Sequence, residues 1–137
     1  MQATAVRELF IVREHARRLV VWADAAERGP TFDVLGRDDA DVDTRALGAA
    51  IPVAVDRVTA PDLARLFRRH PDGWAAFYRT YPGAPGVVEL ASPVWSGDTL
   101  ATVVVGRACG EHCLNAWRVS VRGGRALAAV PLRLPKS

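Results

Sequence analysis

The sequence predicts an α+β domain in which N-terminal helices pack on one face of a C-terminal four-stranded antiparallel β-meander. Two observations support this class. Apolar residues recur at helical spacing through most of residues 1–82, and they alternate with polar residues from 87 to 134. A segment rich in Pro and Gly, residues 81–86, separates the two halves. A chain of 137 residues has the length of one compact domain, so we expect residues 1–137 to form a single unit.

The composition is that of a folded globular protein. Half of the residues are hydrophobic and 24% are charged, which is too apolar for a disordered chain. The net charge of +3 arises from 18 basic residues, all but one of them Arg, spread along the chain. Nucleic-acid binding needs clustered positive charge, so we do not expect such a partner. The strongest groups, expected to be solvated, are Arg65, Arg68 and Arg69 and, more loosely, Arg13, Arg17 and Arg18.

The sequence carries no signal for a membrane or for export. It lacks a run of roughly 18 apolar residues, the length that would span a bilayer. Charged residues such as Arg7, Glu8, Arg13 and Glu14 interrupt every N-terminal stretch that could serve in a secretory signal. We therefore expect a cytoplasmic protein, in which two cysteines are more often reduced than bridged. No cofactor is expected.

The first half of the chain alternates helical signals with irregular ones. Residues 4–17 predict an amphipathic helix. Residues 19–22 fit either a continuation of that helix or a short buried strand, and we favour the strand. Residues 29–43 are rich in Gly, Pro and Asp, which predicts an exposed, mobile loop. Residues 44–50 predict one or two helical turns, and residues 52–55 predict a short edge strand.

Two further helices are predicted after Thr59. This residue can cap a helix that has Pro61 in its first turn, and the Asp-Gly pair at 72–73 separates that helix from the next. The second helix carries aromatic residues at helical spacing: Trp74, Phe77, Tyr78 and Tyr81. These side chains could line a ligand pocket, although a stripe with this spacing more often packs in a core.

The register of the predicted sheet follows from three turns, because side chains alternate between the two faces of a strand. The expected turns lie at residues 97–98, 110–112 and 123–124. They place apolar residues opposite one another on one face: Cys109–Cys113, Val105–Trp117, Val103–Val119, Ala101–Val121, Val121–Ala126, Val119–Ala128, Trp117–Val130, Val94–Ala101, Ser92–Val103 and Leu90–Val105. The other face is mixed, so we expect a helix or a partner to cover it: Glu89, Trp95, Leu100, Thr102, Val104, Arg118, Ser120, Arg122 and Leu127.

The tip of the central hairpin, Cys109-Gly-Glu-His112-Cys113, is the one cluster with chemical potential. Directly opposed residues of an antiparallel pair have Cα atoms roughly 4.5–5.5 Å apart, which suits a disulfide. Cys109, His112 and Cys113 could instead ligate a metal, although a closed structural zinc site needs four ligands. A thioredoxin-like redox site is not indicated, because its two cysteines are separated by two residues at a helix N-terminus. A structural thiol pair is the favoured interpretation.

A wider pattern resembles a group of small uncharacterised bacterial proteins. The resemblance rests on Trp74-Ala-Ala-Phe77, Tyr81-Pro-Gly83, residues 86–90 and the strand that leads to Cys109-Gly110 and Cys113, and it spans residues 52–122. In that group a W-x-x-F-x-x-x-Y-P helix precedes a sheet with a Cys-Gly-x-x-Cys-Gly tip. This chain has one extra residue between the cysteines and Leu114 where the group has glycine. The resemblance implies a topology and no reaction.

These observations favour a non-catalytic binding or accessory domain for a protein or a small apolar ligand. The ligand site would be the aromatic residues or the second sheet face, and a protein partner or a homodimer would use that face. The alternative is a thiol-based redox or metal-responsive protein that works through Cys109, His112 and Cys113. NTF2-like and cystatin-like folds are candidate architectures by analogy. No nucleophile elbow or phosphate-binding glycine loop is present, so an enzyme is not favoured.

Overall fold

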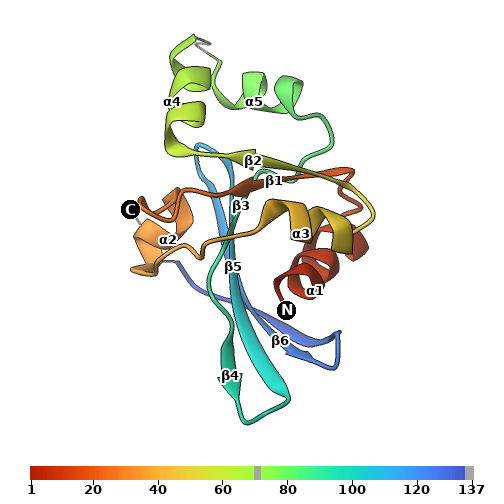
Figure 1. The fold of residues 1–137 in the computed structure, drawn as a ribbon. Helices are drawn as coiled ribbons and strands as arrows, with labels where there is room; N and C mark the ends of the chain where they lie inside the picture. The colour runs from red at the N-terminus through yellow and green to blue at the C-terminus, as the bar shows by residue number, and fades with distance from the viewer. Residues whose placement is uncertain (70–71, 135–137) are drawn as a thin grey trace.

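A computed structural model of the chain describes residues 1–69 and 72–134, and it shows one mixed sheet with helices on both faces (Figure 1). The sheet has seven strands in the order β2-β1-β3-β5-β6-β7, and β4 pairs with β5 outside this path. The strands are β1 (Arg18–Trp22), β2 (Ala54–Val58), β3 (Val87–Leu90), β4 (Val94–Ser96), β5 (Leu100–Gly110), β6 (Cys113–Arg122) and β7 (Arg125–Pro131). The α+β class is confirmed, and the pairing within residues 87–131 is antiparallel as expected. The sheet as a whole differs from the predicted four-stranded meander, because it has seven strands and β1 and β2 join it in parallel.

The N-terminal part of the sheet is parallel. Strand β1 pairs in parallel with β2 on one side and with β3 on the other. All of β1 after Arg18 is buried, which suits a central parallel strand and explains its continuous apolar run. The strand favoured at residues 19–22 is thus confirmed. The predicted edge strand is present as β2, shifted two residues towards the C-terminus.

The long β5–β6 hairpin has the predicted register along most of its length. Val105 faces Trp117, Val103 faces Val119 and Ala101 faces Val121, as expected from the turn. Near the tip the register shifts after Ala108, so Gly110 rather than Cys109 lies directly opposite Cys113. Leu90 also faces Val105 as predicted.

Two outer pairings differ from the prediction by one residue. A bulge beside Ser120 and Val121 lets β7 begin in the expected register, with Val121 facing Ala126, and then moves Val119 opposite Ala129. Trp117 faces Pro131 rather than Val130. On the other side the turn spans residues 97–99, so Trp95 rather than Val94 faces Ala101. A shift of one residue exchanges the faces of a strand.

The helices begin where capping residues and proline allow. They are α1 (Gln2–Val6), which continues as the π-helix η1 (Arg7–Val12), α2 (Pro30–Leu35), α3 (Thr44–Ala50), α4 (Ala60–Arg69) and α5 (Trp74–Thr80). Asp43 caps α3 by accepting from the amides of Arg45 and Ala46. Asp62 accepts from both the amide and the hydroxyl of Thr59 at the start of α4. The helix predicted at residues 4–17 ends at Val12, about five residues early. The helix predicted at residues 44–50 and the two predicted after Thr59 are confirmed as α3, α4 and α5.

The segment predicted to be an exposed loop is irregular only from residue 37 to residue 43, and its first part is a helix. It contains α2, which starts at Pro30 after Gly29 and ends at Gly36 in the left-handed conformation. Thr31 and Phe32 are fully buried. The prediction for residues 29–43 was wrong because buried partners elsewhere in the chain order this segment.

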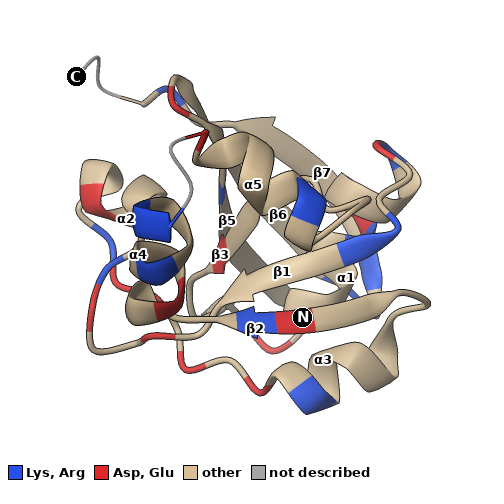
Figure 2. Cartoon of the chain, turned by 90° about the horizontal axis from the view of Figure 1, so that it is seen from above, with Lys and Arg blue, Asp and Glu red and all other residues tan. Residues whose placement is uncertain are grey.

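Helices cover both faces of the sheet, not one. On one face α1, η1 and α3 pack through Val6, Phe10 and Leu47 against the side chains of Leu19, Val103 and Val119. On the other face α4 and α5 pack over the parallel strands, and Phe32 of α2 packs over Val104 (Figures 1 and 2). Among the described helices none is long and apolar enough to cross a membrane.

Candidate functional site

The aromatic residues of α5 pack against one another and against the sheet. Phe77 is fully buried, and its ring centroid lies 5.2 Å from that of Trp74 and 5.1 Å from that of Tyr81. Val20 and Val87 of the sheet belong to the same buried cluster. Among the described residues these rings pack between α5 and the sheet rather than around an open space. Tyr81 also borders a surface cleft beside α4.

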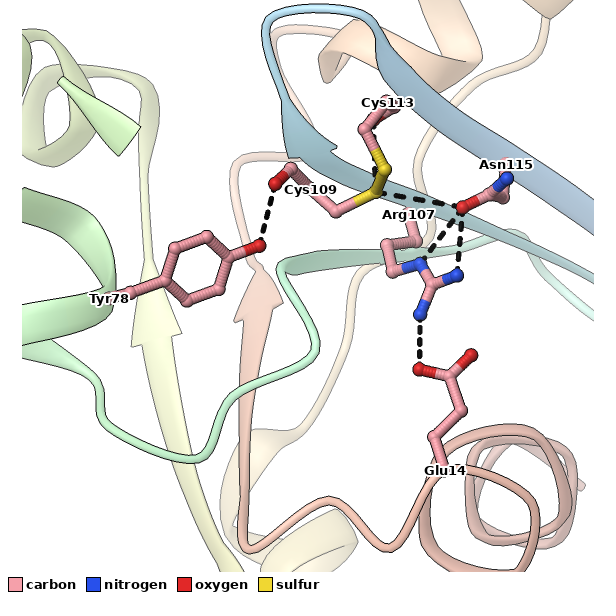
Figure 3. The surroundings of a disulfide bond; sticks show 6 residues. All are labelled: Glu14, Tyr78, Arg107, Cys109, Cys113 and Asn115. Atoms are coloured by element: carbon pink, nitrogen blue, oxygen red, sulfur yellow. Dashed lines mark hydrogen bonds and ion pairs between the residues drawn. A yellow bond between two sulfur atoms is a disulfide. The ribbon is translucent and has the colours of Figure 1, made fainter. Parts of the chain in front are cut away.

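The hairpin tip holds a disulfide between Cys109 and Cys113 (Figure 3). The two Cα atoms are 5.0 Å apart, and the closed loop contains the exposed residues Glu111 and His112. The expected reduced state is therefore replaced by a bridged pair. While this bond is intact neither sulfur can act as a thiolate ligand or nucleophile. Within the described parts of the chain, no group of three or more His, Cys, Asp or Glu side chains is placed to hold a metal ion.

A half-buried cation lies below the tip. The guanidinium of Arg107 donates from Nε and Nη2 to Asn115 Oδ1, at 3.1 and 2.8 Å, and forms an ion pair with Glu14 (Figure 3). It also lies over the rings of Phe10 and Trp117, with its central carbon 5.5 and 5.2 Å from the ring centroids. Only 13% of the Arg107 side chain is exposed. This arrangement joins the N-terminal helical segment to the hairpin, and sequence reasoning missed it.

The helices leave one end of the sheet open on the outer face. We name this surface the distal outer face and define it by the register of four strands: Val94, Thr102, Ser120, Ala128, Arg118 and Val130. Val94 is 63% exposed and Val130 is 52% exposed. The outer face was expected to need a cover, and α2 supplies it over Val104, Gly106 and Glu89. Trp95, expected on this face, lies on the opposite one because of the register shift in β4.

Two buried carboxyl groups anchor α2, and sequence reasoning missed this role. Glu89 is fully buried and accepts from the amides of Thr31 and Phe32, at 2.9 and 3.1 Å. Asp39 accepts from the amide of Gly29 at 2.8 Å. The Gly29-Pro30 pair, a common helix start, was the available signal for α2. Glu89 lies on the outer face as predicted, opposite Gly106, but its burial was not foreseen because its cover, α2, was not predicted.

Burial perturbs both carboxyl groups. Desolvation raises the pKa of Glu89 to about 7, although its two amide donors oppose the shift. Desolvation likewise raises the pKa of Asp39 to about 6, and the amide of Gly29 opposes that shift. The charge of Asp39 also raises the pKa of Glu89, and the charges of Asp38 and Asp24 raise the pKa of Asp39. Glu89 is therefore partly protonated near neutral pH, and the hydrogen bonds of the two carboxyl groups hold the start of α2 in place.

Comparison with known proteins identifies no relative. No family model, no curated protein and no solved structure matches the chain. The resemblance to small bacterial proteins and the analogy to NTF2-like or cystatin-like folds stay predictions. The class that the fold defines is an α+β domain built on a mixed sheet.

Proposed function

We propose that this chain is a non-catalytic binding domain that docks a protein through the distal outer face. The observation that carries the proposal is the exposure of Val94 and Val130 on a face that is otherwise covered by helices. An exposed apolar surface with a polar rim is typical of a protein interaction site. Thr102, Ser120 and Ala128 provide that flat surrounding, and Arg118 adds a charge that suits a carboxylate of the partner.

The partner would pack on the face rather than extend the sheet. Strand β7 is an edge strand, but its pairing is interrupted by the bulge near Leu127, and it ends at Pro131, which has no amide donor. The opposite edge at this end, β4, has only three residues. Neither edge offers the long unpaired ladder that strand addition requires.

A small apolar ligand among the aromatic residues is the weaker form of the same proposal. Phe77 has no exposed surface, and Trp74, Tyr78 and Tyr81 are half-buried in contact with it. A ligand could enter only by displacing packed rings, which would cost the contacts that they make.

The protein that docks on the distal outer face can be a second copy of this chain.

Site-specific photo-crosslinking tests the proposal. A benzoylphenylalanine at position 130 should give a defined cross-linked product in cells that produce the protein, and Val94→Asp should abolish it. The matched control is the same probe at Val12, which is 56% exposed on η1, away from this face. A product of twice the mass of the chain would identify a homodimer. Equal products from positions 12 and 130, or none from 130, would overturn the proposal.

A second candidate function is thiol-based redox sensing at the tip. The observation in its favour is that Cys109 Sγ lies 3.6 Å from Asn115 Oδ1, the atom that also binds Arg107. A neighbouring guanidinium favours a thiolate, so the reduced Cys109 would have a lowered pKa. After reduction with a dithiol, the rate of thiol labelling against pH should give a lower midpoint in the parent protein than in Arg107→Gln. Equal midpoints would contradict redox sensing at the tip. Zinc uptake by the reduced protein, with Cys109, Cys113 and His112 as ligands, would instead favour a metal-responsive protein.

A further inference from the structure

Helix α4 presents a mixed stripe to a surface cleft. Asp62 and Leu66 are four residues apart, as are Arg65 and Arg69, and Asp62 and Arg65 are three apart, as are Leu66 and Arg69, so the four side chains share one side of the helix. All four line a cleft of about 330 Å³. Its other walls come from Val58 at the end of β2, from Leu63, and from Thr80 and Tyr81 at the end of α5.

The charges in this cleft are unequally distributed. The acidic residue, Asp62, lies near the start of α4 and is engaged in capping by Thr59, which lowers its pKa. The two guanidinium groups lie further along the helix, and Figure 2 shows basic segments of α4 in blue. Arg65, Arg68 and Arg69 also surround an adjoining hollow of about 250 Å³. The C-terminal half of the cleft is therefore cationic.

The arginines are available for a ligand at little cost. Arg65 is paired with Asp62 at 2.9 Å, but the two side chains are 60% and 41% exposed. An exposed pair of this kind contributes little to stability, so a ligand could replace it. Two guanidinium groups four residues apart on a helix can grip one phosphate from two sides. Thr80 and Tyr81 line the cleft as well, with the Thr80 hydroxyl donating to the carbonyl of Ala76 within α5.

The floor of the cleft is apolar. Val58 and Leu63 are buried in the core beneath it, and Leu66 packs partly against the same core. An inorganic ion would leave the apolar floor exposed to water, whereas a ligand with an apolar part would cover it. From these features we propose that the cleft binds a small organic phosphate, with its apolar body on Val58, Leu63 and Leu66 and its phosphate between Arg65 and Arg69.

This inference is independent of the proposed docking of a protein. The cleft is formed by α4, α5 and the end of β2, whereas the distal outer face is formed by β4 to β7. Helix-dipole compensation explains basic residues in the last turn of α4, since cations there are favourable. It does not explain why Arg65, one turn earlier, borders the same cleft as Arg69.

A titration with 1-naphthyl phosphate, followed by amide chemical shifts, tests the proposal. The expected result is saturable binding with the largest shifts at Leu66, Arg69, Thr80 and Tyr81. Inorganic phosphate and 1-naphthol, which supply the charge and the apolar body separately, should each bind at least tenfold more weakly. Absence of saturable shifts at these residues, or equal affinity for phosphate alone, would overturn the proposal.

Charge-matched variants separate the site from general attraction to a basic protein. Arg65→Gln and Arg69→Gln should each weaken naphthyl phosphate binding at least fivefold. Arg45→Gln removes the same charge from α3 on the other side of the sheet and should leave the affinity within twofold. Unchanged amide shifts away from α4 would show that each variant is folded. Equal losses in all three variants would indicate diffuse attraction and would contradict a defined site.

Discussion

The hydroxyl of Tyr78 donates a hydrogen bond of 2.7 Å to the carbonyl oxygen of Cys109, which fastens α5 to the strand that ends in the disulfide (Figure 3). We expect Tyr78→Phe to lower the free energy of unfolding by about 1 kcal/mol, because it removes one hydrogen bond and keeps the ring. Urea denaturation measures this change. Tyr81→Phe is the control, since no hydrogen bond joins that hydroxyl to the described residues, and it should cost less than half as much. Equal costs would contradict a specific tie to Cys109.

Removing the disulfide should weaken the fold without destroying it. Five residues lie in the loop that Cys109 and Cys113 close, and chain entropy assigns so small a loop about 2 kcal/mol. The double variant Cys109→Ser, Cys113→Ser should therefore lose about that amount in urea denaturation. A dithiol should lower the stability of the parent protein similarly and leave the double variant unchanged. A parent protein that does not respond to the dithiol would contradict the prediction.

Stability should fall as the pH rises towards and above 7. The pKa of Glu89 is raised from 4.5 to about 7 on folding, so the folded state binds the proton more tightly than the unfolded state does. This contribution is complete below pH 4.5 and is lost as the pH rises through 7. Between pH 5 and 8 it amounts to about 2–3 kcal/mol. Asp39, with its pKa raised to about 6, acts in the same direction.

The variant Glu89→Gln isolates this effect, because the amide stays neutral at every pH. Its free energy of unfolding should decline less steeply between pH 5 and 8 than that of the parent protein. Glu111→Gln changes an exposed carboxyl at the hairpin tip and should preserve the parent's slope. If the slope of Glu89→Gln equals that of the parent, the buried carboxyl is not the source of the pH dependence.

Gly29 is required because the Glu89 carboxyl approaches its backbone. A Cβ at position 29 would lie 2.5 Å from Glu89 Cδ and 2.6 Å from its Oε2, so the buried carboxyl would have to move. We expect Gly29→Ala to cost about 1–3 kcal/mol in urea denaturation. Gly48→Ala is the matched control, because a Cβ at position 48 would meet the side chain of Val55 at an ordinary distance of 3.7 Å. Gly48 lies in α3, where alanine favours the helix, so this substitution should be neutral or stabilise the protein by up to about 1 kcal/mol. A neutral Gly29→Ala would contradict this packing.

The sequence predicted the parts of the fold that follow from local alternation. Val103, Val105 and Val119 lie in the predicted register, although the turn pairs Gly110 with Cys113, because the irregularity between Ala108 and Gly110 restores that register along the rest of the hairpin. A register derived from the turns holds only where strand pairing is continuous. The bulge beside Ser120 interrupts the pairing of β6 with β7, and no Gly or Pro at that position indicates it in the sequence. The burial of Glu89 depends on α2, which lies some 55–60 residues earlier in the chain. Such long-range cover has no local signature.

The candidate sites were predicted less well than the fold. Cys109 and Cys113 were found from their proximity in sequence, whereas Arg107, Glu14 and Asn115 come from three elements and share no motif. The arginines of α4 were recognised as a cluster, but the cleft that they border needs the end of α5 as its second wall. Helical spacing places side chains on one side of a helix and says nothing of what stands opposite.

The parallel pairing of β1 with β3 also sets the order in which this chain can be completed on the ribosome. Val20 and Val21 meet Val87 and Val88, so a central strand made early lacks one neighbour until 65 more residues have been synthesised. At usual rates of translation this delay is about 3–13 s. During this delay β2 is the one neighbour of β1 that has been synthesised. The apolar side chains of β1 are then accessible to chaperones. Nascent chains that end before Leu90 should therefore lack the protected β1 of chains that contain β3.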